Sequence, residues 1–506
     1  MGRVAVAIPP GINGEHTEYD LREGAWLTAS NMRFVEGRAE PIGSWGAVVS
    51  TPGTPVAITL AGICRNILQF AQIGNLGTLT AFGTSSKLYI GNNTVATGAL
   101  EMFDCTPVGF GGTVNGATAI GAFTKPYTNT LSPTIWSLGA YGEILISSPS
   151  FQGIYKSTGP AVATVVTNAP VKNNHVLVAT TARQIVALGC NEAVSGNYNA
   201  RCIRFSDPSD ITLWMPSATN LAYEYILDDP GGIIAGRMVG QYLFVWTEYS
   251  LWLGQYTGDV TNLWRFDRIG QGCGLAGPNA VLVDQQTAWW LSRDGRIFYA
   301  SPGAPPTAID SPVIRDMWDN IAHGQVEKVF AAMVGRYGEM WWYYPDKRDS
   351  AGANLENSRA IFVNRAGNWS RATIARTAYL DSLYFPYPMA VDTSGAVWFH
   401  EWDAGTVAPV WSIESGLQYL DDGQSRNLIR GMWPDFKSQA GNITMTLYGR
   451  DEAQATESVL TTQTLTPTTT RADMLVDARM VRMKFAGTAY ARFGKPAFDV
   501  VRTSGW

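Results

Sequence analysis

The residues whose types could support hydrolysis are two adjacent aspartates, Asp228 and Asp229, in the phrase YILDDPGG. A retaining glycosidase needs two carboxyl groups roughly 5 Å apart. Neighbouring residues on a strand point to opposite faces, and the Pro-Gly-Gly that follows predicts a turn. The pattern therefore favours a structural turn. A glycosidase stays as an alternative, which loss of activity in a folded Asp228→Asn variant would support.

Motifs for metal, phosphate and nucleophile chemistry are missing from the sequence. There is no GxxxxGK[ST] phosphate loop, no HExxH and no GxSxG elbow. No two of the four histidines have the spacing of metal ligands, and the acidic turns lack EF-hand spacing. The histidines are His16, His175, His323 and His400. The acidic turns are the Asx-type turn Asp207–Asp210 and the turn Asp421–Gly423. His400, between aromatic residues in WFHEW, is expected to pack on a strand. We expect no catalytic residue, cofactor or metal.

The five cysteines are odd in number and include no CxxC pair. Buried free thiols are the expected state, which is typical of assembly in a reducing cytoplasm. Cys190 and Cys202 are close enough in sequence to pair across a hairpin, so a disulfide there stays open.

Aromatic residues gather in Trp289-Trp290 and in Trp341-Trp342-Tyr343-Tyr344. Such clusters can stack on sugars. On a propeller strand, however, successive side chains alternate between the two layers that separate neighbouring blades. We therefore expect packing, with sugar binding as the alternative.

Repeated units of strand, polar turn and strand, closed by Gly or Pro, fill the middle of the chain. The last four units are spaced by about 45–55 residues, close to the ~40–50 residues of a four-stranded propeller blade. Turn residues lie where hairpins need them, at Arg293–Gly295, Ala366–Asn368 and Thr393–Gly395. The pattern predicts a mainly β protein, with a propeller of six or so blades over residues 50–423. A sandwich is the alternative for this region.

The two ends of the chain differ from the repeats. Residues 1–49 are expected to contribute to a platform or to the first strands. Residues 424–506 alternate apolar and polar positions, which predicts a small β-sandwich. Its basic residues are expected on a solvated strand face, with a partner or DNA as the alternative: Arg479, Arg482, Lys484, Arg492 and Lys495.

One helix is predicted, over Ser311–Val334. Apolar residues recur there at three- and four-residue steps. Ser311 and Pro312 suit the N-cap and first helical position, and Gly324 is expected to split the segment.

Charge is scarce in this chain. Charged residues make up 16 % of 506, well below the ~25 % of soluble domains. Either partners cover much of the surface, or Thr, Ser and Asn replace charge on it. The net charge of −5 argues against a protein that grips nucleic acid by neutralising phosphates, but permits a channel through which DNA slides. The N-terminal MGRVAVAIPPG lacks a signal-peptide core, and no apolar run approaches the ~20 residues of a membrane span.

Three stretches resemble one family, the tail hub or nozzle proteins of short-tailed bacteriophages. They are NMRFVEGRAEPIGSWGAV (Asn31–Val48), Tyr242–Ala300 with its WWLSRDGRIFYA, and Gly335–Asp381 with its GEMWWYYPD. Their order and spacing also agree with the family.

The resemblance implies a structural virion protein of the tail, assembled in the host cytoplasm. It implies a homo-oligomeric ring of six copies below the portal-side and adaptor rings, in contact with tail fibres or spikes. Genomic double-stranded DNA would pass through the ring without sequence-specific binding, and no membrane insertion is expected. The family has no catalytic residues to carry over. A carbohydrate- or receptor-binding propeller is the alternative function, and a propeller glycosidase the third.

Overall fold

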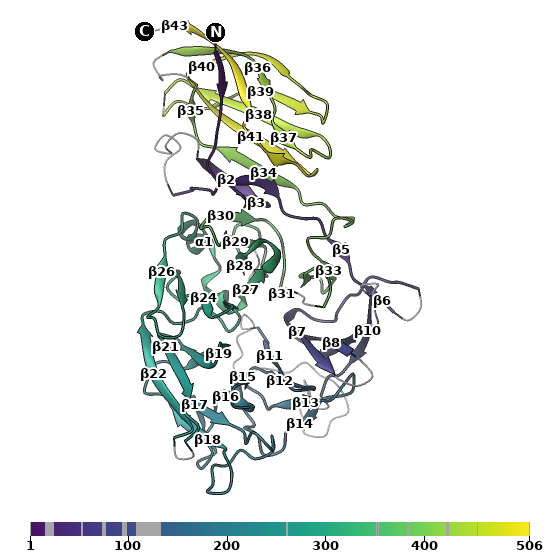
Figure 1. Ribbon diagram of the computed structural model, residues 1–506, viewed down its shortest axis with the longest axis vertical. Coiled ribbons are helices and arrows are strands. Elements are labelled where there is room, and N and C mark those ends of the chain that lie inside the picture. Colours follow the sequence, from purple (N-terminus) through teal and green to yellow (C-terminus); the bar gives the residue numbers. More distant parts are fainter. Residues whose placement is uncertain are drawn as a thin grey trace.

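The computed structural model describes two β-bodies, a propeller and a sandwich (Figure 1). The described residues are 2–15, 25–51, 54–72, 77–93, 99–107, 133–259, 262–350, 352, 354–381, 384–420, 425–452 and 454–504. His16 and the predicted turn Asp421–Gly423 lie outside these ranges. Both chain termini lie at the end of the sandwich that is far from the propeller (Figure 1).

The propeller has seven antiparallel blades, each built outwards from an inner strand. Blade 1 contains β7 (Cys64–Gln72), β8 (Gly77–Thr84), β9 (Leu88–Asn92) and β10 (Ala99–Asp104). Blade 2 contains β11 (Trp136–Tyr141), β12 (Ile144–Pro149), β13 (Tyr155–Ser157) and β14 (Thr164–Val165). Blade 3 contains β15 (Asn173–Ala179), β16 (Gln184–Asn191), β17 (Tyr198–Phe205) and β18 (Tyr223–Ile226). Blade 4 contains β19 (Ile233–Val239), β20 (Tyr242–Thr247), β21 (Ser250–Tyr256) and β22 (Trp264–Gln271). Blade 5 contains β23 (Val281–Asp284), β24 (Thr287–Leu291), β25 (Ile297–Ala300) and β26 (Thr307–Ile309). Blade 6 contains β27 (Phe330–Val334), β28 (Glu339–Tyr344), β29 (Arg359–Asn364) and β30 (Trp369–Ala372).

Blade 7 is closed by a strand from the other end of the chain. Its inner three strands are β31 (Ala378–Leu380), β32 (Met389–Val391) and β33 (Val397–Phe399), and its outer strand is β5 (Gly46–Ala47). The inner strand β31 lies beside β7, so the ring closes. The next short strand, β6 (Val49–Ser50), pairs in parallel with the edge of blade 1. The N-terminal segment therefore fastens the first blade to the last.

The repeat spacing expected from the sequence is confirmed in the second half of the propeller. The inner strands of blades 4 to 7 begin at Ile233, Val281, Phe330 and Ala378, which are 48, 49 and 48 residues apart. Seven blades agree with the prediction of six or so. What the repeat pattern does not show is that blade 7 takes its outer strand from residues 46–47.

The aromatic cluster on β28 confirms packing between blades. Trp341 stacks on Phe362 of the next strand with ring centroids 3.8 Å apart, and shares one core layer with Tyr343. Trp342 and Tyr344 point the other way, into a second core cluster. All four side chains are at most 3 % exposed, so they build the core.

The sandwich takes strands from both ends of the chain. One sheet has the order β1 (Gly2–Ala5), β43 (Ala497–Ser504), β36 (Arg426–Trp433), β40 (Ala472–Ala478). The other has β2 (Trp26–Ser30), β34 (Trp411–Ser415), β41 (Met480–Gly487), β38 (Ile443–Arg450), β39 (Ser458–Leu465), with β35 (Gln418–Tyr419) also beside β41. A short pair, β37 (Phe436–Lys437) and β42 (Arg492–Phe493), completes the body. The sandwich thus begins at Trp411, before the expected boundary at residue 424.

The predicted helix is wrong over its second half. The α-helix α1 spans Ile314–Asn320, the 3-10 helix η1 spans His323–Lys328, and Phe330–Val334 is the strand β27. The strand forms because β27 must pair with β28 and face a core on both sides, which overrides local helical spacing. Ser311 does not cap α1, whose N-cap position is Val313. A further 3-10 turn is η2 (Gly335–Tyr337), and no helix in the described ranges is long and apolar enough to cross a membrane.

Candidate functional site

The acidic pair singled out by the sequence does not converge. Asp228 is exposed, whereas Asp229 is buried and accepts hydrogen bonds from the Gly231 N–H at 2.9 Å and from Trp252 Nε1 at 3.0 Å. Burial alone would raise the pKa of Asp229, but these bonds and those from Ser250 and Thr247 lower it below its usual value. Asp229 is therefore a fixed, ionised cap, and the segment forms the structural turn that the sequence predicted.

The other residues named from the sequence have structural contacts. All five cysteines are free and buried, so Cys190 and Cys202 do not form a disulfide. Asp207 caps its own turn by accepting the Ser209 N–H at 2.8 Å. His400 is buried and stacks on Trp45 with ring centroids 5.5 Å apart. Within the described ranges, no three metal-ligating side chains come together.

Four of the five basic side chains that the sequence singled out in the sandwich make ion pairs within the chain, and the fifth, Lys495, is exposed. Arg482 contacts Glu414 and Glu457, and Lys484 lies 2.8 Å from Glu414. The remaining pairs are Arg479 with Glu452, and Arg492 with Glu36 and Glu40. A solvated, neutralised strand face is the better description of these residues than a DNA-binding face.

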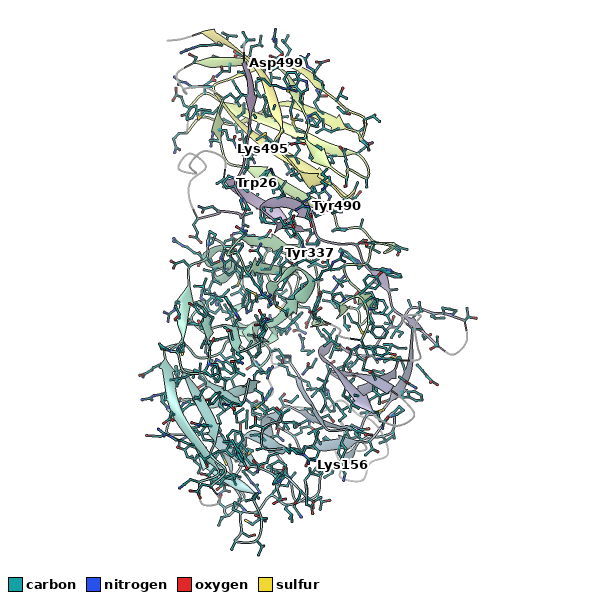
Figure 2. All side chains as sticks on the ribbon, in the orientation of Figure 1. Trp26, Lys156, Tyr337, Tyr490, Lys495 and Asp499 are labelled. Atoms are coloured by element: carbon teal, nitrogen blue, oxygen red, sulfur yellow. The ribbon has the colours of Figure 1, made fainter. Side chains whose placement is uncertain are left out.

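The site where the two bodies meet is a joint built by the hairpin of β3 (Met32–Val35) and β4 (Arg38–Pro41). This hairpin lies between the outer strand β30 of blade 6 and the strand β42 of the sandwich. Tyr337 of the propeller and Tyr490 of the sandwich mark its two sides in Figure 2. The joint is formed by the phrase NMRFVEGRAEP, which begins the stretch Asn31–Val48.

Asn31 makes the turn that sets the hairpin in place. It adopts a left-handed conformation, with φ 56°, which Asn tolerates better than most residues. Its Nδ2 donates to the Val410 carbonyl at 2.8 Å, and its Oδ1 accepts the Thr373 N–H at 2.9 Å. One side chain thus joins β30 to the segment that enters the sandwich.

Arg33 is the centre of the joint. Its two terminal nitrogens donate to the two oxygens of Glu401 at 2.7 and 2.6 Å, and its Nε lies 3.1 Å from Glu339. The guanidinium also lies over the Tyr337 ring at 3.7 Å. Arg33 and Glu339 are each only 1 % exposed. Because Glu339 is on blade 6 and Glu401 follows blade 7, Arg33 fastens the hairpin to two blades at once.

Burial and charge oppose each other in this cluster. Burial alone would lower the pKa of Arg33, but Glu339 and Glu401 raise it above its ordinary value. Burial raises the pKa of Glu339, which Arg33 offsets only in part. The cluster is tolerated as an ionised group because the Arg33 cation lies between the two carboxylates and Glu339 also accepts a hydrogen bond from Trp341 Nε1 at 3.0 Å.

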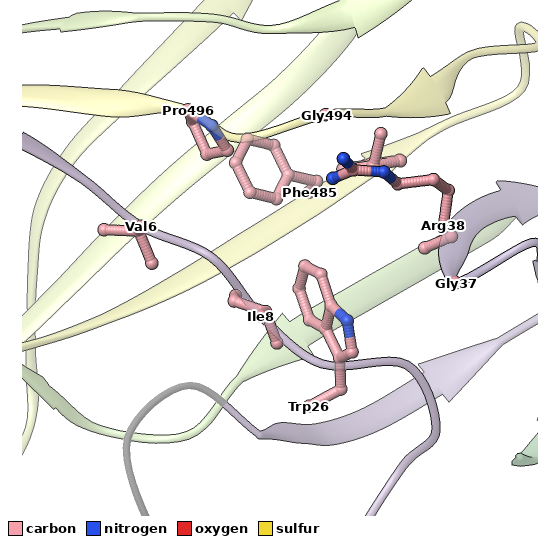
Figure 3. Close-up of a pocket in the computed structure, with 10 residues that line it drawn as sticks. Val6, Ile8, Trp26, Gly37, Arg38, Phe485, Gly494 and Pro496 are labelled. Carbon is pink, nitrogen blue, oxygen red and sulfur yellow. The ribbon is translucent and has the colours of Figure 1, made fainter.

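The sandwich side of the joint is closed by aromatic packing. Trp26, Phe485 and Phe493 surround a cavity of about 20 Å³ beside Ile8 and the hairpin turn at Gly37 (Figure 3). A space of this size holds about one water molecule. Tyr490 donates its hydroxyl hydrogen to Glu40 at 3.1 Å across the same contact. The joint is therefore a packed interface and has no room for a ligand.

A second polar cluster, which the sequence did not reveal, lies among the inner strands of the propeller. Arg237 of blade 4 donates to His175 Nε2 of blade 3 at 2.8 Å and to the Pro278 carbonyl at 2.9 Å. Asn279 accepts from Arg237 at 3.3 Å and donates to the Arg65 carbonyl at 2.9 Å. We call Arg65, His175, Arg237 and Asn279 the axial cluster.

A groove lies on the outer part of blade 3. It encloses about 680 Å³ and is lined by asparagine, threonine and apolar side chains between residues 168 and 220. Several apolar side chains at or beside it are open to solvent: Val171 is 77 % exposed, Val194 90 % and Met215 53 %. Exposed apolar groups around a groove of this volume are typical of a binding surface.

Comparison with known proteins gives the fold alone. No family model and no curated protein matches the chain. Similar solved structures include the Cps50 (Swd1) β-propeller domain of Myceliophteria thermophila, at 11 % identity and a TM-score of 0.40, covering 68 % of this chain and 98 % of that one. BBS1N in complex with ARL6DN is also similar, at 13 % identity and a TM-score of 0.39, covering 71 % of this chain and 97 % of that one. BamB from Moraxella catarrhalis is similar at 11 % identity and a TM-score of 0.34, covering 69 % of this chain and 98 % of that one. The seven-bladed assignment rests on the strand pairing.

We predict that Arg33→Ala lowers the free energy of unfolding by about 3–5 kcal/mol, because it leaves two buried glutamates without their cation. Urea denaturation followed by tryptophan fluorescence measures this. Arg38→Ala, on the exposed side of the same hairpin, is the control and should change stability by no more than about 0.5 kcal/mol. Equal losses in the two variants would contradict the role given to Arg33.

We also predict a loss of stability in mild acid from His175 and His400. Burial, with the nearby Arg237, lowers the pKa of His175; burial, with Arg376 and Arg33, lowers that of His400. The unfolded chain takes up protons near pH 6.5, whereas the folded rings stay neutral. The stability that the two neutral histidines contribute is therefore fully present above about pH 6.5. At lower pH, the free energy of unfolding falls by up to about 1.4 kcal/mol per pH unit for each histidine.

Urea denaturation between pH 7.5 and 5.5 measures this slope. Replacing either histidine with glutamine should remove about half of the histidine contribution to it, whatever the variant does to stability at neutral pH. An unchanged slope in both variants would show that other groups cause it.

Proposed function

We propose that this chain is the subunit of a ring-shaped tail nozzle of a short-tailed bacteriophage. The observation that carries the proposal is an open edge on the sandwich, held in a fixed orientation by the Arg33 joint. The resemblance of Asn31–Val48, Tyr242–Ala300 and Gly335–Asp381 to nozzle proteins supports it. In this proposal six copies surround a channel below the portal-side and adaptor rings, and tail fibres or spikes attach outside.

The open edge is the strand β39. Within the described ranges it pairs with β38 and with no other strand. Its sequence, SVLTTQTL, has no charge and no proline over eight residues. Natural proteins protect free edges with lysine, proline, short length or a bulge, and of these β39 has only a register shift at Leu460. Val459 on β39 is 60 % exposed, and Leu475 on the neighbouring β40 is 77 % exposed. Such an edge suits contact with a second copy.

The charges suit a channel that lets DNA pass. The net charge is −5, and Arg479, Lys484 and Arg492 of the sandwich pair with glutamates. Affinity for DNA depends on free cations that displace counterions from phosphates. A lumen poor in such cations holds DNA loosely, so the genome can slide without sequence-specific binding.

We predict that the purified chain forms closed rings in negative-stain images, and that Val459→Lys with Leu475→Lys shifts it to monomers. Two charges per copy at the edge would have to be buried without partners, which opposes association. Mass photometry at matched concentrations measures the species. Val194→Lys, at an exposed apolar site on blade 3, is the control and should keep the rings.

A wild-type chain that stays monomeric at high concentration, and in tail preparations, would refute the nozzle. If the rings survive the double substitution but are lost in Val194→Lys, the contact between copies lies on blade 3 and not at the β39 edge. Both substituted sites are exposed, so misfolding should not confuse the readout.

The groove on blade 3 favours a second candidate function, recognition of a carbohydrate or receptor. Its volume and its amide and hydroxyl groups suit a sugar chain. This candidate predicts saturable binding of host surface polysaccharide, weakened at least about tenfold by Met215→Asp and unaffected by Val459→Lys. Isothermal titration with purified polysaccharide measures it. Absence of binding to host polysaccharide would remove this candidate and leave the nozzle proposal unchanged.

A further inference from the structure

The inner strands of the propeller bring several cations close to its axis. Arg237 is on β19 of blade 4 and Arg65 is on β7 of blade 1, yet Asn279 hydrogen-bonds to both residues. Lys328, just before β27 of blade 6, lies 3.0 Å from Glu356, and Arg65 lies 2.7 Å from the same carboxylate. Three blades thus direct positive charge towards one region.

The described anions in this region do not balance the cations. Glu356 is shared between Arg65 and Lys328. Arg237 contacts carbonyl oxygens, the Asn279 amide and His175, and no carboxylate in the described ranges pairs with it. Burial, with no anion to offset it, lowers the pKa of Arg237 to about 10. Three cations and one carboxylate leave about two positive charges in excess.

A cavity of about 90 Å³ lies among these groups. Arg65, Asn66, Arg237 and Asn279 line it on the polar side, and Phe330 and Tyr379 on the other. Its volume is several times the ~10–15 Å³ needed by a single water. The Nε and Nη1 atoms of Arg65, which is only 6 % exposed, have no hydrogen-bond acceptor in the described ranges. Unused buried donors of this kind call for an acceptor.

We propose that this axial cavity binds one small inorganic oxyanion, such as phosphate or sulfate, between Arg65 and Arg237. An oxyanion supplies the acceptors that Arg65 lacks and removes most of the excess charge. Guanidinium groups suit oxyanions, because their N–H donors spread over a plane and stay charged when buried. The neutral His175 keeps Arg237 in place without competing for the anion. The bound anion would tie blades 1, 4 and 5 together at the axis.

The test uses the full-length chain and inorganic phosphate. We expect the ³¹P line of phosphate to broaden in the presence of wild-type protein, and the melting temperature to rise by roughly 1–2 °C and then saturate. Saturation matters because phosphate also stabilises proteins non-specifically, with an effect that keeps growing with concentration. Sodium chloride at the same ionic strength is the reference.

Two variants and a control identify the site. Arg237→Gln should abolish the broadening and the saturable rise. Asn279→Asp, which places a carboxylate beside Arg237 with almost no change of shape, should abolish both as well, even if Arg237→Gln folds poorly. Arg315→Gln, a cation 78 % exposed on α1, should behave like the wild type.

Two results would overturn the proposal. One is a wild-type chain with no line broadening and no saturable rise. The other is a response of equal size in Arg237→Gln, Asn279→Asp and Arg315→Gln, which would place phosphate elsewhere. Neither result bears on ring formation, which is measured without phosphate.

Discussion

The contact of Arg33 with Glu339 and Glu401 decides how the sandwich is held against the propeller. A buried guanidinium is tolerated only where anions compensate its charge, and here Glu401 accepts two hydrogen bonds from Arg33 and Glu339 on blade 6 forms an ion pair with it. The hairpin that carries Arg33 has little freedom to rock, because a small tilt would separate buried charges. The same hairpin packs against Trp26 and Phe493. The hairpin therefore contacts both bodies, which would fix their orientation in the proposed ring subunit.

The scarcity of charge in the sequence has a structural counterpart. Many charged side chains are used inside the chain: Arg33 at the joint, Arg482 in the sandwich, Lys328 near the axis. Other charges are exposed and paired, as in Arg265 with Asp267 and Arg296 with Asp294. The edge strand β39 carries none of the charges that usually prevent association. The axial cluster is the opposite case, where charge is concentrated and under-compensated.

The sequence predicted what depends on local pattern. The hairpin turn at Gly367, the alternation of Trp341 and Trp342 and the turn after Asp229 all follow from short-range rules, and they are confirmed. The sequence did not predict what depends on distant pairing. The segment FAAMV predicts helix because it has no local mark of a strand until β28 lies beside it. The partners of Arg33 are more than 300 residues away, and those of Arg237 are on other blades, so no spacing rule could find them.

The outer strand of blade 7 comes from Gly46–Ala47, and β1 of the sandwich pairs with β43 at the far end of the chain. During synthesis these early segments must wait for partners that leave the ribosome on the order of tens of seconds later. Blades 1 to 6 can form in sequence, but blade 7 cannot close before β33 is made, and β1 has no partner before β43 is made. A nascent chain therefore carries an unfinished sandwich. In the proposed ring, association through the β39 edge would follow completion of that body.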